Sequence, residues 1–158
     1  MTIRHLPAFT VIGIAQRTNN AREMSPEGII GPMWDRIVSG NLLDKIPNRA
    51  DTNVLAMYTD YESDAKGDYT FFIGPKVVSS DVVPEGMIAK TIGAARYAVF
   101  TSDRGPLYEV VPRLWQRIWS MPADELGGER AYLADLEFYD ERALNPSDAV
   151  MEVWVEIK

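Results

Sequence analysis

The feature that most constrains the fold is an internal repeat. The segment MWDRIVS, residues 33–39, recurs as LWQRIWS, residues 114–120, so that Trp34 corresponds to Trp115 at an offset of 115 − 34 = 81 residues. Without a gap, the same offset places the strand-like segment 55–58 on 136–139. Repeated segments of this length indicate a duplicated structural unit. We therefore expect residues 33–77 to superpose on residues 114–158, with the two helices related by a near two-fold axis.

The two copies differ at the centre of the repeated strand, where Ala56 in the first copy corresponds to Glu137 in the second. Strand side chains alternate between faces, so Glu137 and Tyr139 share one face while Leu136 and Phe138 share the other. An acid that only one copy of the repeat carries is not needed for the repeated packing. It therefore indicates a functional role. The Glu137 face is either an ordinary exposed strand face or the floor of a polar, aromatic pocket.

Each copy predicts the order strand, helix, strand, strand. In the first copy, residues 9–15, 54–61 and 69–73 have the β-branched and aromatic content of strands. The triplet Ser25-Pro26-Glu27 predicts a helix start with Ser25 as N-cap, although Gly31-Pro32 can delay the regular helix. A buried helical stripe is predicted at Ile30, Met33, Trp34, Ile37 and Val38.

The second copy repeats this order. Residues 88–100 predict its first strand, Gly105-Pro106 opens its helix, and residues 132–140 and 149–157 predict its last two strands. The same five-point stripe recurs at Val111, Leu114, Trp115, Ile118 and Trp119. Hairpin-connected strands are antiparallel, so the expected fold class is α+β.

Composition favours one domain without a metal or a cofactor. At 158 residues and 46% apolar content the chain can bury a proper core, so we expect a single domain over 1–158, with module one at about 1–83 and module two at about 84–158. The absence of cysteine excludes disulfides, thiolate metal sites and thiol nucleophiles. We find no metal-ligand spacing and no phosphate-binding glycine pattern, and therefore expect no metal and no cofactor.

The net charge of the chain limits the classes of molecule that it is expected to bind. A formal net charge of −7 argues against a nucleic-acid surface and favours neutral or cationic partners. Neither a signal-peptide pattern nor a long apolar run is visible, so the expectation is a cytoplasmic protein that does not contact the membrane. We expect a monomer or a weak homodimer.

Several short segments, taken together in order and spacing, resemble the GyrI-like small-molecule-binding domain, also called the AraC-type effector-binding domain. The resemblance covers nearly the whole chain and is carried by residues 9–14, 57–62, 73–74, 97–100, 114–115 and 135–139, together with Trp34. It implies two modules related by a pseudo-two-fold axis, with a ligand groove between them. In that family an acid on the middle strand of the second module lies in an aromatic pocket for bulky, often cationic, lipophilic compounds, and Glu137 matches this acid. Many relatives carry a helix-turn-helix domain that this sequence lacks, so direct transcription-factor activity is not expected.

The candidate ligand-binding residues follow from strand alternation, the offset and this resemblance. A carboxylate in an apolar groove is costly unless it is paired, and aromatic faces attract cations. Besides Glu137, we expect Tyr58, Tyr139, Phe71 and Trp154 to line the groove, all on the side of the sheet away from the helix stripes. Trp34 and Trp115 are expected mainly in the core, with Trp115 able to reach the groove.

Three functions stay open at this point. The first is a binder that sequesters lipophilic, cationic small molecules. The second is a cofactor-independent hydrolase of cyclopropane-bearing alkylating antibiotics, an activity known among GyrI-like proteins, with Glu137 as general acid or base and Tyr139 as hydrogen-bond donor. The third is a protein partner, DNA gyrase or a part of the transcription machinery, as relatives that inhibit gyrase imply.

Overall fold

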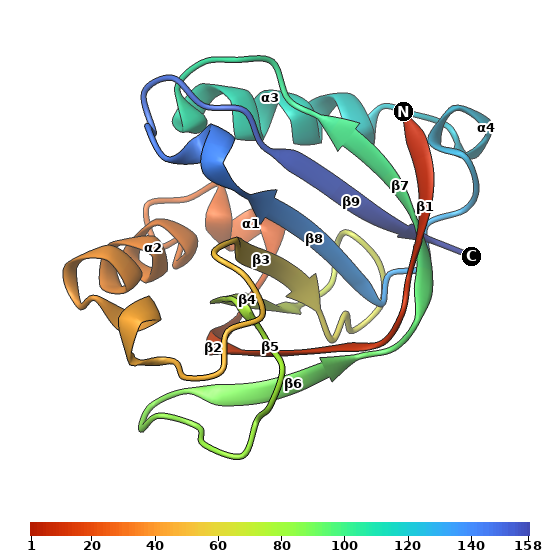
Figure 1. Ribbon diagram of the computed structural model, residues 1–158. Helices are drawn as coiled ribbons and strands as arrows, with labels where there is room; N and C mark the ends of the chain where they lie inside the picture. Colours follow the sequence, from red (N-terminus) through yellow and green to blue (C-terminus); the bar gives the residue numbers. More distant parts are fainter.

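Nine strands form one curled antiparallel sheet in the computed structural model, which describes residues 1–158 (Figure 1). In chain order the strands are β1 (Thr2–Leu6), β2 (Phe9–Thr18), β3 (Val54–Thr59), β4 (Tyr69–Gly74), β5 (Lys76–Val77), β6 (Ile88–Ile92), β7 (Ala95–Thr101), β8 (Ala134–Tyr139) and β9 (Glu152–Ile157). Their order across the sheet is β1-β7-β9-β8-β3-β4-β2-β5, and β6 pairs with β2. All paired strands run antiparallel.

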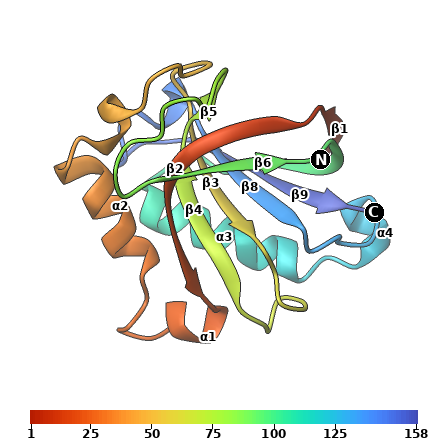
Figure 2. The ribbon, with the colours of Figure 1, turned by 90° about the horizontal axis from the view of Figure 1, so that it is seen from below.

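Two main helices, α2 (Ile30–Ser39) and α3 (Leu107–Trp119), cover the same face of the sheet, as Figures 1 and 2 show. The shorter helical segments are α1 (Asn20–Glu23), α4 (Ala123–Leu126) and the 3₁₀ turns η1 (Leu42–Lys45) and η2 (Glu141–Ala143). An antiparallel sheet with separate helices confirms the predicted α+β class. No helix combines the length and the apolar content that crossing a membrane would require.

The two halves of the chain meet at the centre of the sheet, where β3 pairs with β8. In this antiparallel register Ala56 lies opposite Glu137. These are the two positions that the repeat equates, so the pseudo-two-fold axis passes between them. The repeated units are β2-α2-β3-β4 and β7-α3-β8-β9, which confirms the predicted pseudo-two-fold arrangement.

The first half carries two more strands than the sequence predicted, β1 and the short β5, and the second half carries one more. The single strand expected over 88–100 is interrupted at Gly93-Ala94, which separates β6 from β7, and Pro7-Ala8 likewise separates β1 from β2. Proline lacks a backbone N–H and glycine bends easily, so both break a ladder. The extra strands β1 and β6 are exchanged between the halves, since β1 pairs with β7 and β6 pairs with β2.

The start of the first main helix also differs from the prediction. Ser25-Pro26-Glu27 forms turns, and α2 begins only at Ile30. The N-cap residue, Ile29, has no polar side-chain atom that could cap the helix. Instead the carboxylate of Glu23, at the end of α1, accepts the backbone N–H groups of Ile29 and Ile30 at 3.0–3.1 Å. An acid from outside the helix thus satisfies amides that the helix cannot satisfy itself.

The helix stripes are buried or half-buried except at their last position. Val38 is 75% exposed and the equivalent Trp119 is 45% exposed, so the five-point stripes were each one residue too long. Both positions fall in the last turn, since α2 ends at Ser39 and α3 at Trp119. The buried stripe residues are Met33, Ile37, Leu114, Trp115 and Ile118.

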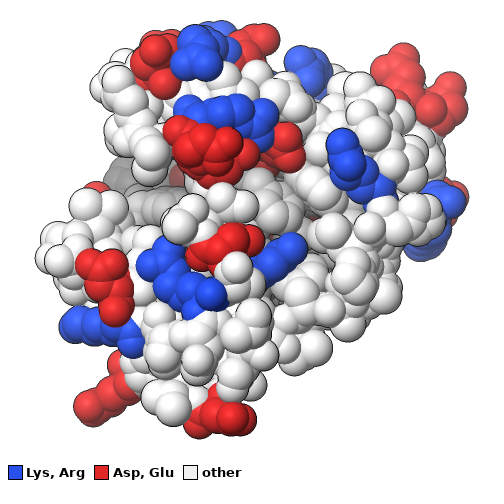
Figure 3. All heavy atoms as spheres, in the orientation of Figure 1, with Lys and Arg blue, Asp and Glu red and all other residues white.

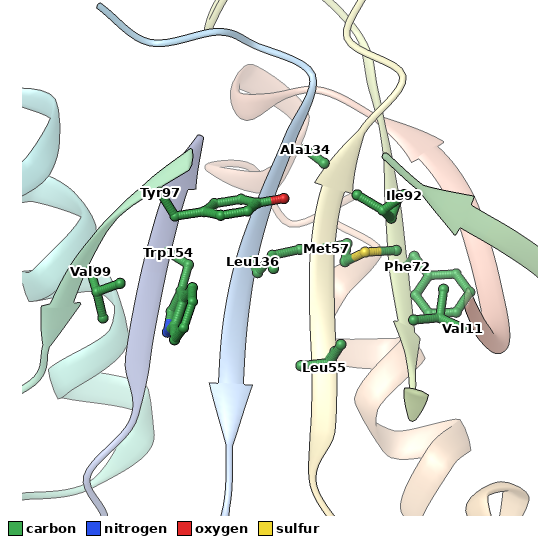
Figure 4. Close-up of a cluster of buried hydrophobic side chains, with 10 residues drawn as sticks. All are labelled: Val11, Leu55, Met57, Phe72, Ile92, Tyr97, Val99, Ala134, Leu136 and Trp154. Carbon is green, nitrogen blue, oxygen red and sulfur yellow. The ribbon is translucent and has the colours of Figure 1, made fainter. Parts of the chain in front are cut away.

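The sheet has an apolar layer on each face, and the helices lie on the Glu137 face rather than the Leu136 face. Ala56 and Phe71 pack with Met33 of α2, whereas Leu136 packs on the other side with the residues drawn in Figure 4. The expectation that Glu137 lies away from the helices is therefore wrong. Because the sheet curls, Val11 of β2 and Ile92 of β6 bury the Leu136 face without a helix.

Candidate functional site

Glu137 is a buried carboxylate at the centre of the sheet, only 2% exposed. It accepts three hydrogen bonds, from the hydroxyl of Tyr58 at 2.7 Å, the hydroxyl of Tyr139 at 2.6 Å and the indole Nε1 of Trp115 at 2.7 Å. These donors come from β3, β8 and α3, so elements of both halves hold the acid. None of the three carries a positive charge, and Glu137 takes part in no ion pair.

Burial dominates the electrostatics of this cluster. It raises the pKa of Glu137 above its ordinary value, and the hydrogen bonds from Tyr139, Tyr58 and Trp115 oppose that rise only in part. Burial and the nearby charge of Glu137 raise the pKa of the Tyr58 and Tyr139 phenols well above their ordinary value. The phenols therefore stay protonated and donate to the acid. When Glu137 is ionised, no protein cation balances its negative charge.

The aromatic contacts around Glu137 repeat across the pseudo-two-fold axis. The ring of Trp115 meets Tyr58 edge-on at a centroid distance of 5.2 Å, and Trp34 meets Tyr139 edge-on at 5.1 Å. The offset of 81 residues equates the two pairs, so each helix presents its tryptophan to the tyrosine of the other half. The indole of Trp115 has the Glu137 carboxylate as its acceptor, whereas Ala56 offers Trp34 none.

A cavity of about 300 Å³ lies beside this cluster, between α1 with the first residue of α2 on one side and α3 on the other, and under the end of the β3–β4 hairpin. Its wall is largely apolar and aromatic, and Glu137 lies behind two of its members, Tyr58 and Trp115. In the orientation of Figure 3 the surface is hollowed between α2 and α3, and positive and negative side chains are interspersed around it. The aromatic and charged lining residues are Tyr58, Tyr61, Tyr69, Trp115, Trp119, Glu23 and Arg130.

Of the residues expected in the groove, the structure brings Glu137, Tyr58, Tyr139 and Trp115 into direct contact. Phe71 lies beneath Tyr58, with ring centroids 5.1 Å apart, and is fully buried. Trp115 is closer to the acid than expected, since the helices cover this face.

The placement of Trp154 on the groove face is wrong. Trp154 lies opposite Leu136 in the β8–β9 ladder and packs on Phe138 with a centroid distance of 4.8 Å, on the other face. The cause is a change of register between the copies. Ala56 pairs with Ile73 but Glu137 pairs with Val153, so the last strand follows an offset of 153 − 73 = 80 residues rather than 81. A slip of one residue moves every side chain of a strand to the opposite face.

Sequence reasoning missed a second buried acid on the same strand face. Asp135 is 0% exposed, and its Oδ2 accepts hydrogen bonds from Arg130 at 2.7 Å and from the Tyr61 hydroxyl at 2.6 Å. Asp135 precedes Glu137 by two residues, so strand alternation alone places both on one face. Arg130 and Tyr61 lie in irregular segments, where no periodic pattern indicates a position.

Comparison with known proteins supports an effector-binding assignment. Residues 2–157 match the family model Cass2, described as integron-associated effector binding protein. The Bacillus subtilis (strain 168) protein YobU, whose name describes a transcriptional regulator, is 34% identical over 99% of this chain and 96% of its own length. The transcriptional regulator BrlR of Pseudomonas aeruginosa is 29% identical over 93% of this chain, which spans 50% of that protein.

Solved structures share the fold over almost the entire chain. The integron cassette protein VCH_CASS2 from the mobile metagenome of Vibrio cholerae has a TM-score of 0.78 and 26% identity, with 99% of this chain and 95% of that chain covered. SAV2435, solved bound to tetraphenylphosphonium, has a TM-score of 0.78 and 15% identity, with 99% and 93% covered. The chain therefore belongs to the Cass2 family of integron-associated effector-binding proteins, which has the GyrI-like fold.

Proposed function

We propose that this protein binds bulky lipophilic cations in the cavity between α1 and α3, with Glu137 as the anionic anchor. The observation that carries the proposal is a buried carboxylate whose partners, Tyr58, Tyr139 and Trp115, are all neutral donors. Burying a charge without a counter-charge is costly, so a bound cation would offset the cost of burying the Glu137 carboxylate. The fold is shared with SAV2435, whose bound ligand, tetraphenylphosphonium, is an aromatic cation.

The cavity wall suits such a ligand in a second way. Tyr58 and Trp115 form part of the wall and separate the cavity from Glu137. A cation against these rings gains about 0.5–2 kcal/mol from each favourable cation–π contact, in addition to its attraction to the carboxylate behind them. The apolar remainder of the wall favours aromatic or alkyl substituents, so the ligand class is lipophilic as well as cationic.

The first prediction is a pH-dependent affinity for tetraphenylphosphonium. Because burial raises the pKa of Glu137, its charge is lost at a higher pH than that of an exposed glutamate. Affinity should be highest well above this pKa and fall by up to roughly tenfold per pH unit below it, since one proton competes with the cation. Isothermal titration from neutral to mildly acidic pH measures this, with circular dichroism to verify folding.

The control for this titration is a neutral ligand of similar shape, such as triphenylphosphine oxide. It should bind with nearly the same affinity across the pH range because it gains nothing from the charge of Glu137. A cation affinity that ignores pH while the protein stays folded would contradict the anchoring role of Glu137.

A second candidate function is hydrolysis of cyclopropane-bearing alkylating compounds. The observation favouring it is a carboxyl of raised pKa in direct contact with two protonated phenols, Tyr58 and Tyr139. Such a group can act as a general acid or base while the phenols donate to a developing oxyanion. We expect a water adduct, detectable by mass spectrometry, from a panel of these compounds, and its loss in Glu137→Gln. No adduct above the buffer reaction would leave binding as the function.

A further inference from the structure

The cavity wall is backed by two buried acids that differ in how their charge is balanced. Asp135 and Glu137 point to the same face of β8, about 7 Å apart along the strand. Glu137 has only neutral partners, whereas Asp135 forms an ion pair with Arg130 at 2.7 Å. Asp135 also accepts the backbone N–H of Glu156 at 2.9 Å through its other oxygen. Only one of the two acids therefore lacks a positive partner.

Both acids are connected to the same cavity through a tyrosine. Tyr58 donates to Glu137, Tyr61 donates to Asp135, and both rings line the cavity. Arg130 lines it as well, next to Tyr61. Two acids, Glu137 and Asp135, therefore lie next to each other behind the cavity wall. Arg130 neutralises Asp135, the second of the two.

Arg130 is held at this position by more than its ion pair. Its side chain is 13% exposed, and its guanidinium lies over the ring of Tyr132 at 4.4 Å from the centroid. The Nε of Arg130 is buried and has no hydrogen-bond partner. The guanidinium is therefore fixed by its stacking contact with Tyr132 and its ion pair with Asp135, and its Nε–H stays unsatisfied.

Glu23, the third acid beside the cavity, does not change the net charge of the site. The carboxylate of Glu23 accepts the backbone N–H groups of Ile29 and Ile30 and the hydroxyl of Thr18. It is committed to the N-terminus of α2, whose partial positive charge offsets it. The cavity consequently carries one unmatched negative charge, that of Glu137.

We infer that Arg130 sets the charge of the ligand, so that the cavity accepts aromatic monocations and disfavours dications of the same shape. The inference rests on the proposed function, because it concerns the selectivity of the same cavity. A second positive charge about 7 Å from the first would lie at the Asp135 position, which Arg130 already fills. Like charges repel strongly where water is excluded, so Arg130 acts as a specificity-determining residue.

The test uses two probes that share one shape and differ by one charge. They are 1-methyl-4-phenylpyridinium, a monocation, and 1,1′-dimethyl-4,4′-bipyridinium, a dication. The wild type should bind the monocation at least roughly tenfold more tightly, and Arg130→Gln should move the ratio of the two affinities toward the dication by at least roughly tenfold. The change in the ratio is the decisive quantity, because it cancels the intrinsic difference in hydration between the probes.

A matched control is Arg49→Gln, which removes the same charge at the position that the repeat equates with Arg130. Arg49 also has a buried Nε without a partner, but it does not line the cavity. The ratio of affinities should therefore stay at the wild-type value in this variant. A shift of the same size as in Arg130→Gln would show a general effect of net charge and overturn the inference.

Two further variants separate charge from structure. Asp135→Asn leaves Arg130 without its counter-charge, so the affinities for both probes should fall. Adding Arg130→Gln to Asp135→Asn restores a single negative charge, and the monocation affinity should recover relative to Asp135→Asn alone. A purely structural role of the pair predicts that the second substitution brings no recovery.

Thermal unfolding with and without probe keeps the test decisive if a variant is unstable. A ligand that binds only the folded state raises its melting temperature, so the dication should stabilise Arg130→Gln more than the monocation does. An unchanged affinity ratio in folded Arg130→Gln overturns the inference while the proposed function stands. Failure of the wild type to bind either probe or tetraphenylphosphonium refutes the proposed function itself.

Discussion

Glu137→Gln is expected to weaken tetraphenylphosphonium binding by about 30-fold or more at neutral pH. Removing one partner of a desolvated charge pair costs about 2–5 kcal/mol, and each 1.4 kcal/mol is a factor of ten in affinity. The substitution removes the charge and keeps the volume. The hydroxyl of Tyr139 can turn to accept from the new amide, which leaves the remaining oxygen to accept from Tyr58 and from the indole of Trp115. The loss is therefore expected from charge alone.

Two comparisons give this prediction its controls. A neutral ligand of similar shape, triphenylphosphine oxide, should lose no more than about threefold in affinity, because it gains only from the aromatic wall. Glu141→Gln removes the same formal charge from an exposed position and should leave both affinities unchanged. Equal losses for the cationic and the neutral ligand in Glu137→Gln, measured by titration calorimetry, would show that Glu137 does not recognise charge.

The repeat made most of the architecture predictable. A duplicated helix stripe and strand require a second copy of the same packing, and the observed pairing of Ala56 with Glu137 places the symmetry axis at the centre of the repeat. The same argument identified Glu137, because only an alignment of the two copies shows that the acid is present once. Tyr58 and Tyr139 followed from the same offset.

The face of the sheet that carries the helices could not be predicted in this way. Alternation shows which residues share a face, but it does not show which face a helix covers when both are apolar. Here Leu136 is buried by the curl of the sheet and by the exchanged strands β1 and β6, whose breaks at Pro7 and Gly93 the sequence pattern did not predict. Trp154 was misplaced because one strand ladder slips by a single residue between the copies.

The last prediction is that the two acids of β8 affect stability in opposite directions. Asp135→Ala should lower the free energy of unfolding by about 3–5 kcal/mol, since it leaves the buried Arg130 guanidinium unpaired and removes the acceptor of Tyr61. Glu137→Gln should raise that free energy by about 1 kcal/mol at neutral pH, because it removes a buried charge that no cation balances. Urea unfolding of both variants and the wild type measures the difference.

The pH dependence of the free energy of unfolding shows whether Glu137 stabilises or destabilises the fold. Burial raises the pKa of Glu137 in the folded state, so the folded protein binds more protons than the unfolded chain between the two pKa values. The contribution of Glu137 to stability is fully present below the unfolded pKa and is lost as the pH rises through the folded one. Glu137→Gln should remove this part of the pH dependence, and its advantage over the wild type should disappear in acid. If Glu137→Gln instead destabilises the fold as Asp135→Ala does, Glu137 is a structural acid. The expected gain would mean that the fold retains a carboxylate that costs it stability, as binding sites commonly do.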